Sequence, residues 1–197
     1  SKVKISDICF VKGGKRIPKG LTFSSKTTNR PYLRVADFKD NSIDIKDLKF
    51  IDDLVFEKIS NYIISKEDVY ISIAGTTGLI GLIPDSLDSA SLTENAAKLV
   101  IKDKKVISKE YLMYCLLIPS NQSSFRASTH STSVGKLALF RIQNIIINLP
   151  LLKNQQEIVE KLEVVQNYKK LLQKEKTILK ELFDSVLDKS IKGEMDN

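Results

Sequence analysis

The chain has 197 residues, of which 42% are hydrophobic, which is enough for one sizeable globular domain and a further long element. Its formal net charge of +7 favours a polyanionic partner over none. Because the chain has a single histidine and two distant cysteines (Cys9 and Cys115), we expect neither a zinc site nor a disulfide framework. Because it has no long apolar run and no signal segment, we expect a cytoplasmic protein.

The positive charge is concentrated at the start of the chain. Residues 1–34 hold nine Lys and Arg against a single acidic residue, whereas residues 150–197 hold nine Lys and nine acidic residues. The segment Lys12–Gly20 is both basic and rich in glycine, so its backbone can approach a surface closely while its cations face that surface. It lacks the spacing of a nucleotide-binding P-loop. A solvated turn is the alternative interpretation.

Short apolar segments separated by polar turns follow this basic segment. Residues Asp68–Ala74 and Leu79–Ile83 are typical of two strands, and the turn Gly75–Gly78 joins them into a hairpin. The other predicted strands are Arg30–Phe38, Ile43–Ile51, Leu92–Ile101 and Phe140–Leu149, and the predicted helices are Leu54–Tyr62 and Glu110–Leu117. Asn121–Ser133 is rich in Ser and Thr and is predicted to be a loop. Together these patterns predict a mixed α+β domain over residues 1–149.

No arrangement of residues in this domain indicates catalysis. The one histidine, His130, lies in the Ser/Thr-rich segment and is not expected to act as a base. Asn29–Tyr32 resembles the motif of amino-methyltransferases only superficially, because an arginine replaces its first proline and no cofactor loop accompanies it. The scattered carboxylates are interpreted as a solvated acidic face without metal-site spacing: Asp37, Asp40, Asp44, Asp47, Asp52 and Asp53. We therefore expect a reader that needs no cofactor or metal.

The last quarter of the chain predicts one long helix, Asn154–Ile191, within a second region of residues 150–197. Asn154 and Glu157 have the spacing of a capping box, Pro150 prevents an earlier start, and Gly193 ends the helix. At 1.5 Å per residue such a helix is roughly 55 Å long.

This helix carries two neighbouring apolar stripes, wider than a two-stranded zipper needs. The first stripe is Ile158, Leu162, Val165, Leu172, Leu179, Phe183 and Val186. The second stripe is Val164, Tyr168, Leu171, Ile178 and Leu182. We expect an intermolecular or interdomain bundle, with packing on the chain's own domain as the alternative.

The order of these segments resembles the specificity subunit of type I restriction–modification enzymes over nearly the whole chain. The matching segments are GKRIPKG, PYLRVADF, DVYISIAGTTGLIG, LTENAAKLV, VGKLALFRI, INLPLLKNQQEIVEKLE and LDKSIKGEM. The resemblance implies a target recognition domain followed by a helical spacer. Family members usually carry two such units in one chain, and this chain has one. It is therefore either a natural half-subunit or a fragment, and a homodimer through antiparallel long helices is expected.

The resemblance also implies double-stranded DNA, a modification subunit that methylates adenine and a restriction subunit as partners. Lys12, Lys15, Arg16, Lys19 and Lys136 are then expected to contact phosphates. The expected base-reading residues are Thr76, Thr77, Arg126, Ser128, Thr129 and Ser131. Arg126 is singled out because a guanidinium can pair bidentately with guanine, although it could instead bind phosphate or cap a turn.

A non-catalytic scaffold that assembles through the long helix, with a head that binds protein, is the alternative function. A DNA-mimicking antirestriction protein is disfavoured by the positive charge. A salt-dependent affinity for DNA, or its absence, separates the reader from the scaffold.

Overall fold

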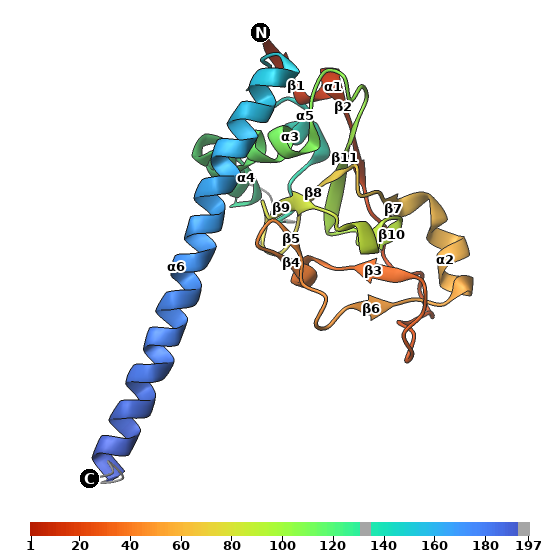
Figure 1. Cartoon of the computed structure of the whole chain (residues 1–197). Helices are drawn as coiled ribbons and strands as arrows, with labels where there is room; N and C mark the ends of the chain where they lie inside the picture. Colours follow the sequence, from red (N-terminus) through yellow and green to blue (C-terminus); the bar gives the residue numbers. More distant parts are fainter. Residues whose placement is uncertain (131–134, 193–197) are drawn as a thin grey trace. The chain divides into compact units, whose positions relative to one another are not determined.

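The computed structural model describes the backbone of residues 1–130 and 135–192, and the side chains of all of these except 128–130. The chain forms two compact units, Ser1–Gln155 and Gln156–Asn197. The first unit, called the head below, contains short strands and helices, and the second consists of the greater part of one long helix (Figure 1). The expected α+β class with a long C-terminal helix is confirmed.

The described elements follow one another in the order shown in Figure 1. The strands are β1 (Lys2–Lys4), β2 (Cys9–Gly13), β3 (Pro31–Leu33), β4 (Phe38–Lys39), β5 (Ser42–Ile43), β6 (Lys49–Phe50), β7 (Ile63–Ile64), β8 (Val69–Ser72), β9 (Ile80–Leu82), β10 (Ala90–Leu92), β11 (Ala96–Ile101) and β12 (Ile146–Asn148). The helices are α1 (Ile5–Ile8), η1 (Val35–Asp37), α2 (Asp53–Ile59), η2 (Ser60–Tyr62), η3 (Asp85–Leu87), α3 (Lys109–Leu117), α4 (Pro119–His130), α5 (Leu139–Gln143) and α6 (Leu152–Lys192). No described helix is long and apolar enough to cross a membrane.

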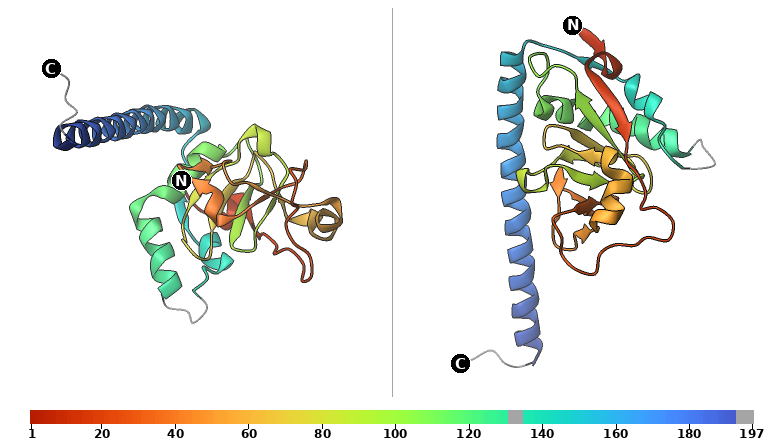
Figure 2. Two further views of the ribbon diagram at one scale, coloured as in Figure 1. Left: turned by 90° about the horizontal axis from the view of Figure 1, so that it is seen from below. Right: turned by 90° about the vertical axis from the view of Figure 1, so that its right-hand side faces the viewer.

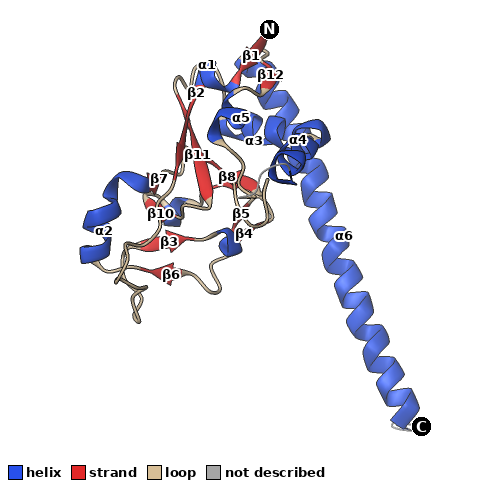
Figure 3. Ribbon diagram, turned by 180° about the vertical axis from the view of Figure 1, so that it is seen from behind, coloured by secondary structure: helices blue, strands red, loops and turns tan. Residues whose placement is uncertain are grey.

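Two four-stranded sheets form the centre of the head (Figure 3). The first has the order β2-β11-β8-β9 and is antiparallel throughout, with Lys98 opposite both Lys12 and Tyr70. The second has the order β6-β3-β10-β7, in which β3 and β10 run parallel. Because β10 and β11 belong to different sheets, the turn between them, Thr93–Asn95, lies where the sheets meet.

A shared apolar core joins the two sheets. Leu33, Ile64 and Leu92 of the second sheet are buried in one cluster with Tyr70 and Ala96 of the first. Each fully buried leucine or isoleucine stabilises the fold by roughly 1.5–3 kcal/mol. A second cluster covers α2, and α2 and α4 lie at opposite ends of the head in Figure 1, in the left view of Figure 2 and in Figure 3.

Several predicted elements are confirmed. The hairpin is present, with Val69 opposite Leu82 and Ile71 opposite Ile80 in an antiparallel pair. The helix predicted at 110–117 is α3, and the one predicted at 54–62 is α2 followed by the short helix η2.

The predicted loop at 121–133 is wrong where the structure describes it, because α4 extends to His130. Pro119 occupies the first helical position, where its missing N–H costs nothing. The backbone N–H of Gln122 donates to the carbonyl of Ile118 at 3.1 Å, and Phe125 is buried at 2% exposure. The burial of the Phe125 ring and the favourable position of Pro119 in the first turn therefore outweigh the weak helix preference of the Ser residues.

Four predicted strands were too long. The segment 92–101 is divided at Thr93, whose carbonyl accepts from the N–H of Ala96 and closes a turn between β10 and β11. The segment 140–149 is α5 followed by β12, since the N–H of Ile145 bonds to the carbonyl of Ile142. In 30–38 the carboxylate of Asp37 accepts from the N–H of Arg34 at 2.7 Å and bends the chain into η1. The segment 43–51 is strand only at its two ends.

The long helix begins at Leu152, two residues before the predicted start, so Asn154 is not its cap. The N–H of Gln155 donates to the carbonyl of Leu151 at 3.1 Å, which places the first helical bond directly after Pro150. The fully buried carboxamide of Gln155 donates to the carbonyls of Pro150 and Val106 and accepts from the N–H of Ser108. Gln155 therefore fixes the start of the helix, which spans 41 residues and about 60 Å at 1.5 Å per residue.

Candidate nucleic-acid interface

The basic segment is held firmly where it leaves β2. The N–H of Gly14 donates to the carbonyl of Ala96 at 3.0 Å, and the N–H of Lys15 donates to the carbonyl of Leu92 at 2.8 Å. The hydroxyl of the buried Tyr32 donates to the carbonyl of Lys15 at 2.7 Å. Gly14 packs so closely that a Cβ there would lie 2.2 Å from the carbonyl oxygen of Thr93, which no side chain could tolerate. The start of this segment is thus built into the sheet junction.

Arg16 extends from this held backbone and pairs with Glu94. Its Nε donates to Glu94 Oε1 at 2.7 Å, and its side chain remains 77% exposed while that of Glu94 is 23% exposed. The second carboxylate oxygen of Glu94 accepts from the hydroxyl of Thr93 at 2.9 Å. Burial raises the pKa of Glu94, but the hydrogen bonds from Arg16 and Thr93 outweigh it and leave the pKa below its ordinary value. Glu94 is therefore a fixed carboxylate at pH 7.

The hairpin and the segment after α4 both form hydrogen bonds with the turn Thr93–Asn95. The carbonyl of Asn95 accepts from the N–H groups of Ile73 and Ala74, directly before the turn Gly75–Gly78. Lys136 Nζ donates to the carbonyl of Glu94 at 2.6 Å, and the N–H of Leu137 donates to the carbonyl of Ile73 at 2.7 Å. Arg16, the hairpin and Lys136 thus meet around residues 93–95. We call this arrangement the Thr93–Asn95 junction.

A cleft of about 550 Å³ opens beside the Arg16–Glu94 pair. Its wall combines cations, aromatic rings and polar groups, and Phe23 and Tyr32 meet edge to face within it at 5.5 Å between ring centroids. The other polar lining residues are Thr22, Arg34, Thr93 and Asn95. Sequence reasoning treated Thr93, Glu94 and Asn95 only as the start of a strand. Their cluster of three consecutive polar residues between apolar runs was the available signal.

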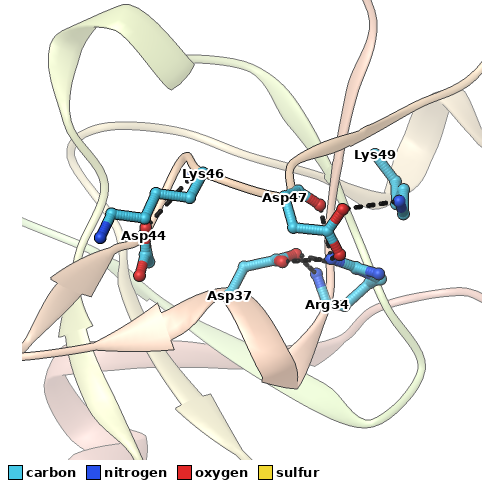
Figure 4. Close-up of polar contacts among 6 residues, drawn as sticks. All are labelled: Arg34, Asp37, Asp44, Lys46, Asp47 and Lys49. Atoms are coloured by element: carbon cyan, nitrogen blue, oxygen red, sulfur yellow. Dashed lines mark hydrogen bonds and ion pairs between the residues drawn. The ribbon is translucent and has the colours of Figure 1, made fainter.

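Arg34 also lines this cleft, but its guanidinium group is engaged in ion pairs and hydrogen bonds within the head (Figure 4). Its Nη2 lies 2.6 Å from Asp37 Oδ1, its Nε bonds to the other Asp37 oxygen, and Nη2 also donates to the carbonyl of Asp47 at 2.7 Å. The carboxylates of Asp47 and Asp44 accept from Lys49 Nζ and the N–H of Lys46 respectively. Asp37 is only 3% exposed, so the interpretation of all six carboxylates as a solvated face is wrong for this one.

The predicted lysines do not share one environment. Lys12 is exposed on β2, with Nζ 5.7 Å from the ring centre of the exposed Phe10, and Lys102 Nζ lies 4.8 Å from the same ring. Lys15 Nζ lies 5.6 Å from the ring centre of Tyr62. Lys19 is exposed. Lys98, opposite Lys12 in register, is half-buried beside Asp68, and burial lowers the pKa of its ammonium group.

The predicted base-reading residues are distributed over the hairpin and α4. Thr76 is exposed and its carbonyl accepts from the hydroxyl of Ser72, whereas the hydroxyl oxygen of Thr77 is buried and has no hydrogen-bond partner in the described part of the chain. Arg126 is on α4 with an exposed side chain, and Gln122 of the same helix donates to the carbonyl of Gly78 at 3.1 Å. The side chains of Ser128 and Thr129, and Ser131 as a whole, lie outside the described residues.

The cysteines are poor nucleophiles. Cys9 is buried, and burial raises the pKa of its thiol to about 12. Burial also raises the pKa of the half-buried Cys115. Among the side chains that the structure describes, no three of His, Cys, Asp or Glu gather into a potential metal site.

The apolar stripes of α6 are exposed along its length. In the first stripe the exposed fractions run from 37% at Leu162 to 65% at Leu179 and Phe183. The second stripe is similar, from 52% at Leu171 to 65% at Tyr168. Contiguous exposed apolar surface of this extent is unusual on a monomeric protein.

The structure thus combines an α+β head, which has a polar, cation-bearing sheet junction, with one very long amphipathic helix. The family model for the type I restriction modification DNA specificity domain matches residues 1–182. The chain therefore belongs to the family of type I restriction–modification specificity domains.

Curated and solved relatives agree with this assignment. The chain is 25% identical over 167 residues to the type I restriction enzyme EcoBI specificity subunit of Escherichia coli, covering 83% of this chain and 35% of that protein. It has the fold of a chain solved in a study of complex assembly and conformational transition of the type I R-M system (TM-score 0.72, 21% identity) and of the HsdS subunit from Thermoanaerobacter tengcongensis (TM-score 0.62, 19% identity). These two matches cover 96% and 99% of this chain and 45% of each solved chain. The chain thus spans less than half the length of these relatives.

Proposed function

We propose that this chain is a DNA-reading unit of a type I restriction–modification system, contacting one half-site of a bipartite target per copy. The family match over residues 1–182 carries this proposal, since it extends over the head and most of α6. The net charge and the cations around the Thr93–Asn95 junction support it. Catalysis then belongs to the partners, a modification subunit and a restriction subunit, and this chain supplies recognition without a cofactor.

Phosphate contact is proposed for the exposed lysines Lys12, Lys15 and Lys19 and for Lys136. Each phosphate neutralised by such a cation releases counterions, so the affinity falls with salt. For base contact the exposed residues Thr76 and Arg126 are proposed, since both come from the elements that adjoin the junction or contact its hairpin. The buried hydroxyl of Thr77 makes that residue a weaker choice than the sequence indicated.

The long helix is proposed to pair antiparallel with a second α6. Two exposed apolar stripes on 41 residues need a long apolar partner, and another α6 matches them in length and character. A two-fold pair of identical units would read a palindromic, interrupted target whose gap is set by helix length. In a protein that carries two such units in one chain, the second unit would supply the partner helix.

A salt titration of DNA binding tests the proposed function. We expect the full chain to bind a random 30-base-pair duplex with an affinity that falls linearly with salt on a logarithmic plot, and Lys15→Ala to reduce the slope by about 0.9. Lys170→Ala on α6 is the matched control, because it removes an exposed cation outside the head and should leave the slope unchanged. A wild-type chain with no measurable DNA affinity at low salt would instead favour the scaffold.

A further inference from the structure

The Arg16–Glu94 pair is built differently from a phosphate contact. A phosphate-binding cation works through its net charge, yet Glu94 neutralises Arg16 at 2.7 Å. An arginine held by a carboxylate through Nε stays charged and keeps its flat, directional donor groups, but the pair as a whole carries no net charge. This combination suits a planar hydrogen-bond acceptor better than a phosphate.

The backbone beneath Arg16 is also unusually well fixed. Three hydrogen bonds hold Gly14 and Lys15, and Gly14 allows the segment to lie directly on the carbonyls of Leu92 and Thr93. On the other side, the carboxylate of Glu94 is bound at one oxygen by Arg16 and at the other by Thr93. Both partners of the pair are thus oriented before any ligand arrives, which lowers the entropy cost of a directional contact.

The donor groups that remain point to a specific acceptor. In the described part of the chain, Nη1 and Nη2 of Arg16 make no hydrogen bond, and the side chain is 77% exposed. An exposed, pre-oriented guanidinium edge matches the two acceptors of guanine, O6 and N7, in the major groove. Arg34 cannot take this role, because Asp37 and Asp47 occupy its guanidinium.

We propose that Arg16, oriented by Glu94, reads one guanine of the DNA half-site. This inference rests on the proposed function and changes the role expected for Arg16 from phosphate contact to base readout. Arg16 is the reading residue, and Glu94 is a positioning residue that acts through it.

The experiment is the selection of bound duplexes from a random 30-base-pair library by the full chain and its variants, followed by sequencing. We expect wild type to select a motif with a guanine that the double variant R16Q/E94Q no longer selects. The preference for that guanine should fall roughly 5- to 150-fold, the range for one bidentate base contact. The other positions should be retained. The double variant removes one positive and one negative charge, so its salt slope should equal that of wild type.

The single variant E94Q separates positioning from charge. Freed from its carboxylate, Arg16 keeps its charge and loses its fixed orientation. We expect E94Q to bind random duplexes more tightly and with a steeper salt slope, while its preference for the guanine falls. If Glu94 had only a structural role, E94Q would leave the preference for the guanine unchanged. Thermal unfolding of each variant shows whether the head remains folded.

The outcomes distinguish the inference from the proposed function. A motif selected by wild type and kept in full by R16Q/E94Q overturns the role of Arg16 alone. A wild-type chain that binds duplexes but selects no motif, or that binds none, overturns both. If the salt slope of R16Q/E94Q falls by about 0.9 relative to wild type, as for Lys15→Ala, Arg16 is a phosphate contact and the inference is wrong.

Discussion

Replacing Gly14 with alanine tests whether the basic segment is part of the sheet junction. The added Cβ would lie 2.2 Å from the carbonyl oxygen of Thr93 and 2.3 Å from that of Leu92, both backbone atoms that cannot rotate away. The segment must therefore move, and the hydrogen bonds from Gly14 and Lys15 to β11 and β10 are lost. Overpacking costs about 1–3 kcal/mol and each lost hydrogen bond about 1 kcal/mol, so Gly14→Ala should reduce the free energy of unfolding by about 3–5 kcal/mol.

Gly13 provides a matched control one residue away. A Cβ at Gly13 would meet only Leu139 Cδ1, at the ordinary distance of 3.9 Å, so Gly13→Ala should change the stability by less than about 1 kcal/mol. Urea unfolding followed by tyrosine fluorescence measures both, since the chain has no Trp and only Tyr168 of its six Tyr lies in α6. Equal stability of the two variants would show that the segment is not packed against residues 92–93 as described.

Three further predictions follow from the geometry. Arg34→Ala leaves the buried carboxylate of Asp37 without its guanidinium and should lower the free energy of unfolding, measured in urea, by about 3–5 kcal/mol. Lys39→Ala is the control: it breaks a more exposed pair with Asp44 and should lower that free energy by less than about 1 kcal/mol. The pKa of Glu94 is lowered in the folded head, so the carboxylate stabilises the fold above its ordinary pKa of 4.5 and this stabilisation is lost as the pH falls through the lower folded value. The difference in free energy of unfolding between wild type and E94Q should therefore shrink on acidification from about pH 6. A difference that does not change with pH would contradict the ion pair. The double variant Leu172→Asp with Leu179→Asp should be folded but monomeric in light scattering, because it places charges in the apolar stripe of α6. Lys170→Asp, on the surface of the same helix, is the control. A wild-type chain that stays monomeric at high micromolar concentration would refute pairing through α6.

The sequence predicted those elements whose apolar pattern is local. The hairpin β8–β9 consists of two apolar runs on either side of a Gly-containing turn, α3 is a short apolar run, and the long helix has no Gly or Pro to interrupt it. It failed for α4, where Ser and Thr dominate and a single buried ring, Phe125, decides the outcome through contacts with the rest of the head. It also misplaced the start of α6, because Gln155 finds its partners at Val106 and Ser108, nearly fifty residues earlier.

The candidate site was only partly predicted, because local patterns do not reveal contacts between residues that are far apart in the sequence. Basic residues in a glycine-rich segment are visible locally, so Arg16 was identified without its partner. Glu94 lies 78 residues away, and no local pattern connects the two. The burial of Asp37 was likewise hidden, because it depends on Arg34 turning back onto the chain and on the loop that carries Asp47.

At the junction, the groups that hold the fold differ from the side chains that we propose read DNA. Gly14 and Lys15 are held chiefly through backbone groups, and so is Asn95, whose carbonyl receives two N–H groups. The lack of a side chain at Gly14 and the buried hydroxyl of Tyr32 also help to position the segment. Substitutions at Arg16 and Glu94 should therefore change the base that is read without unfolding the head.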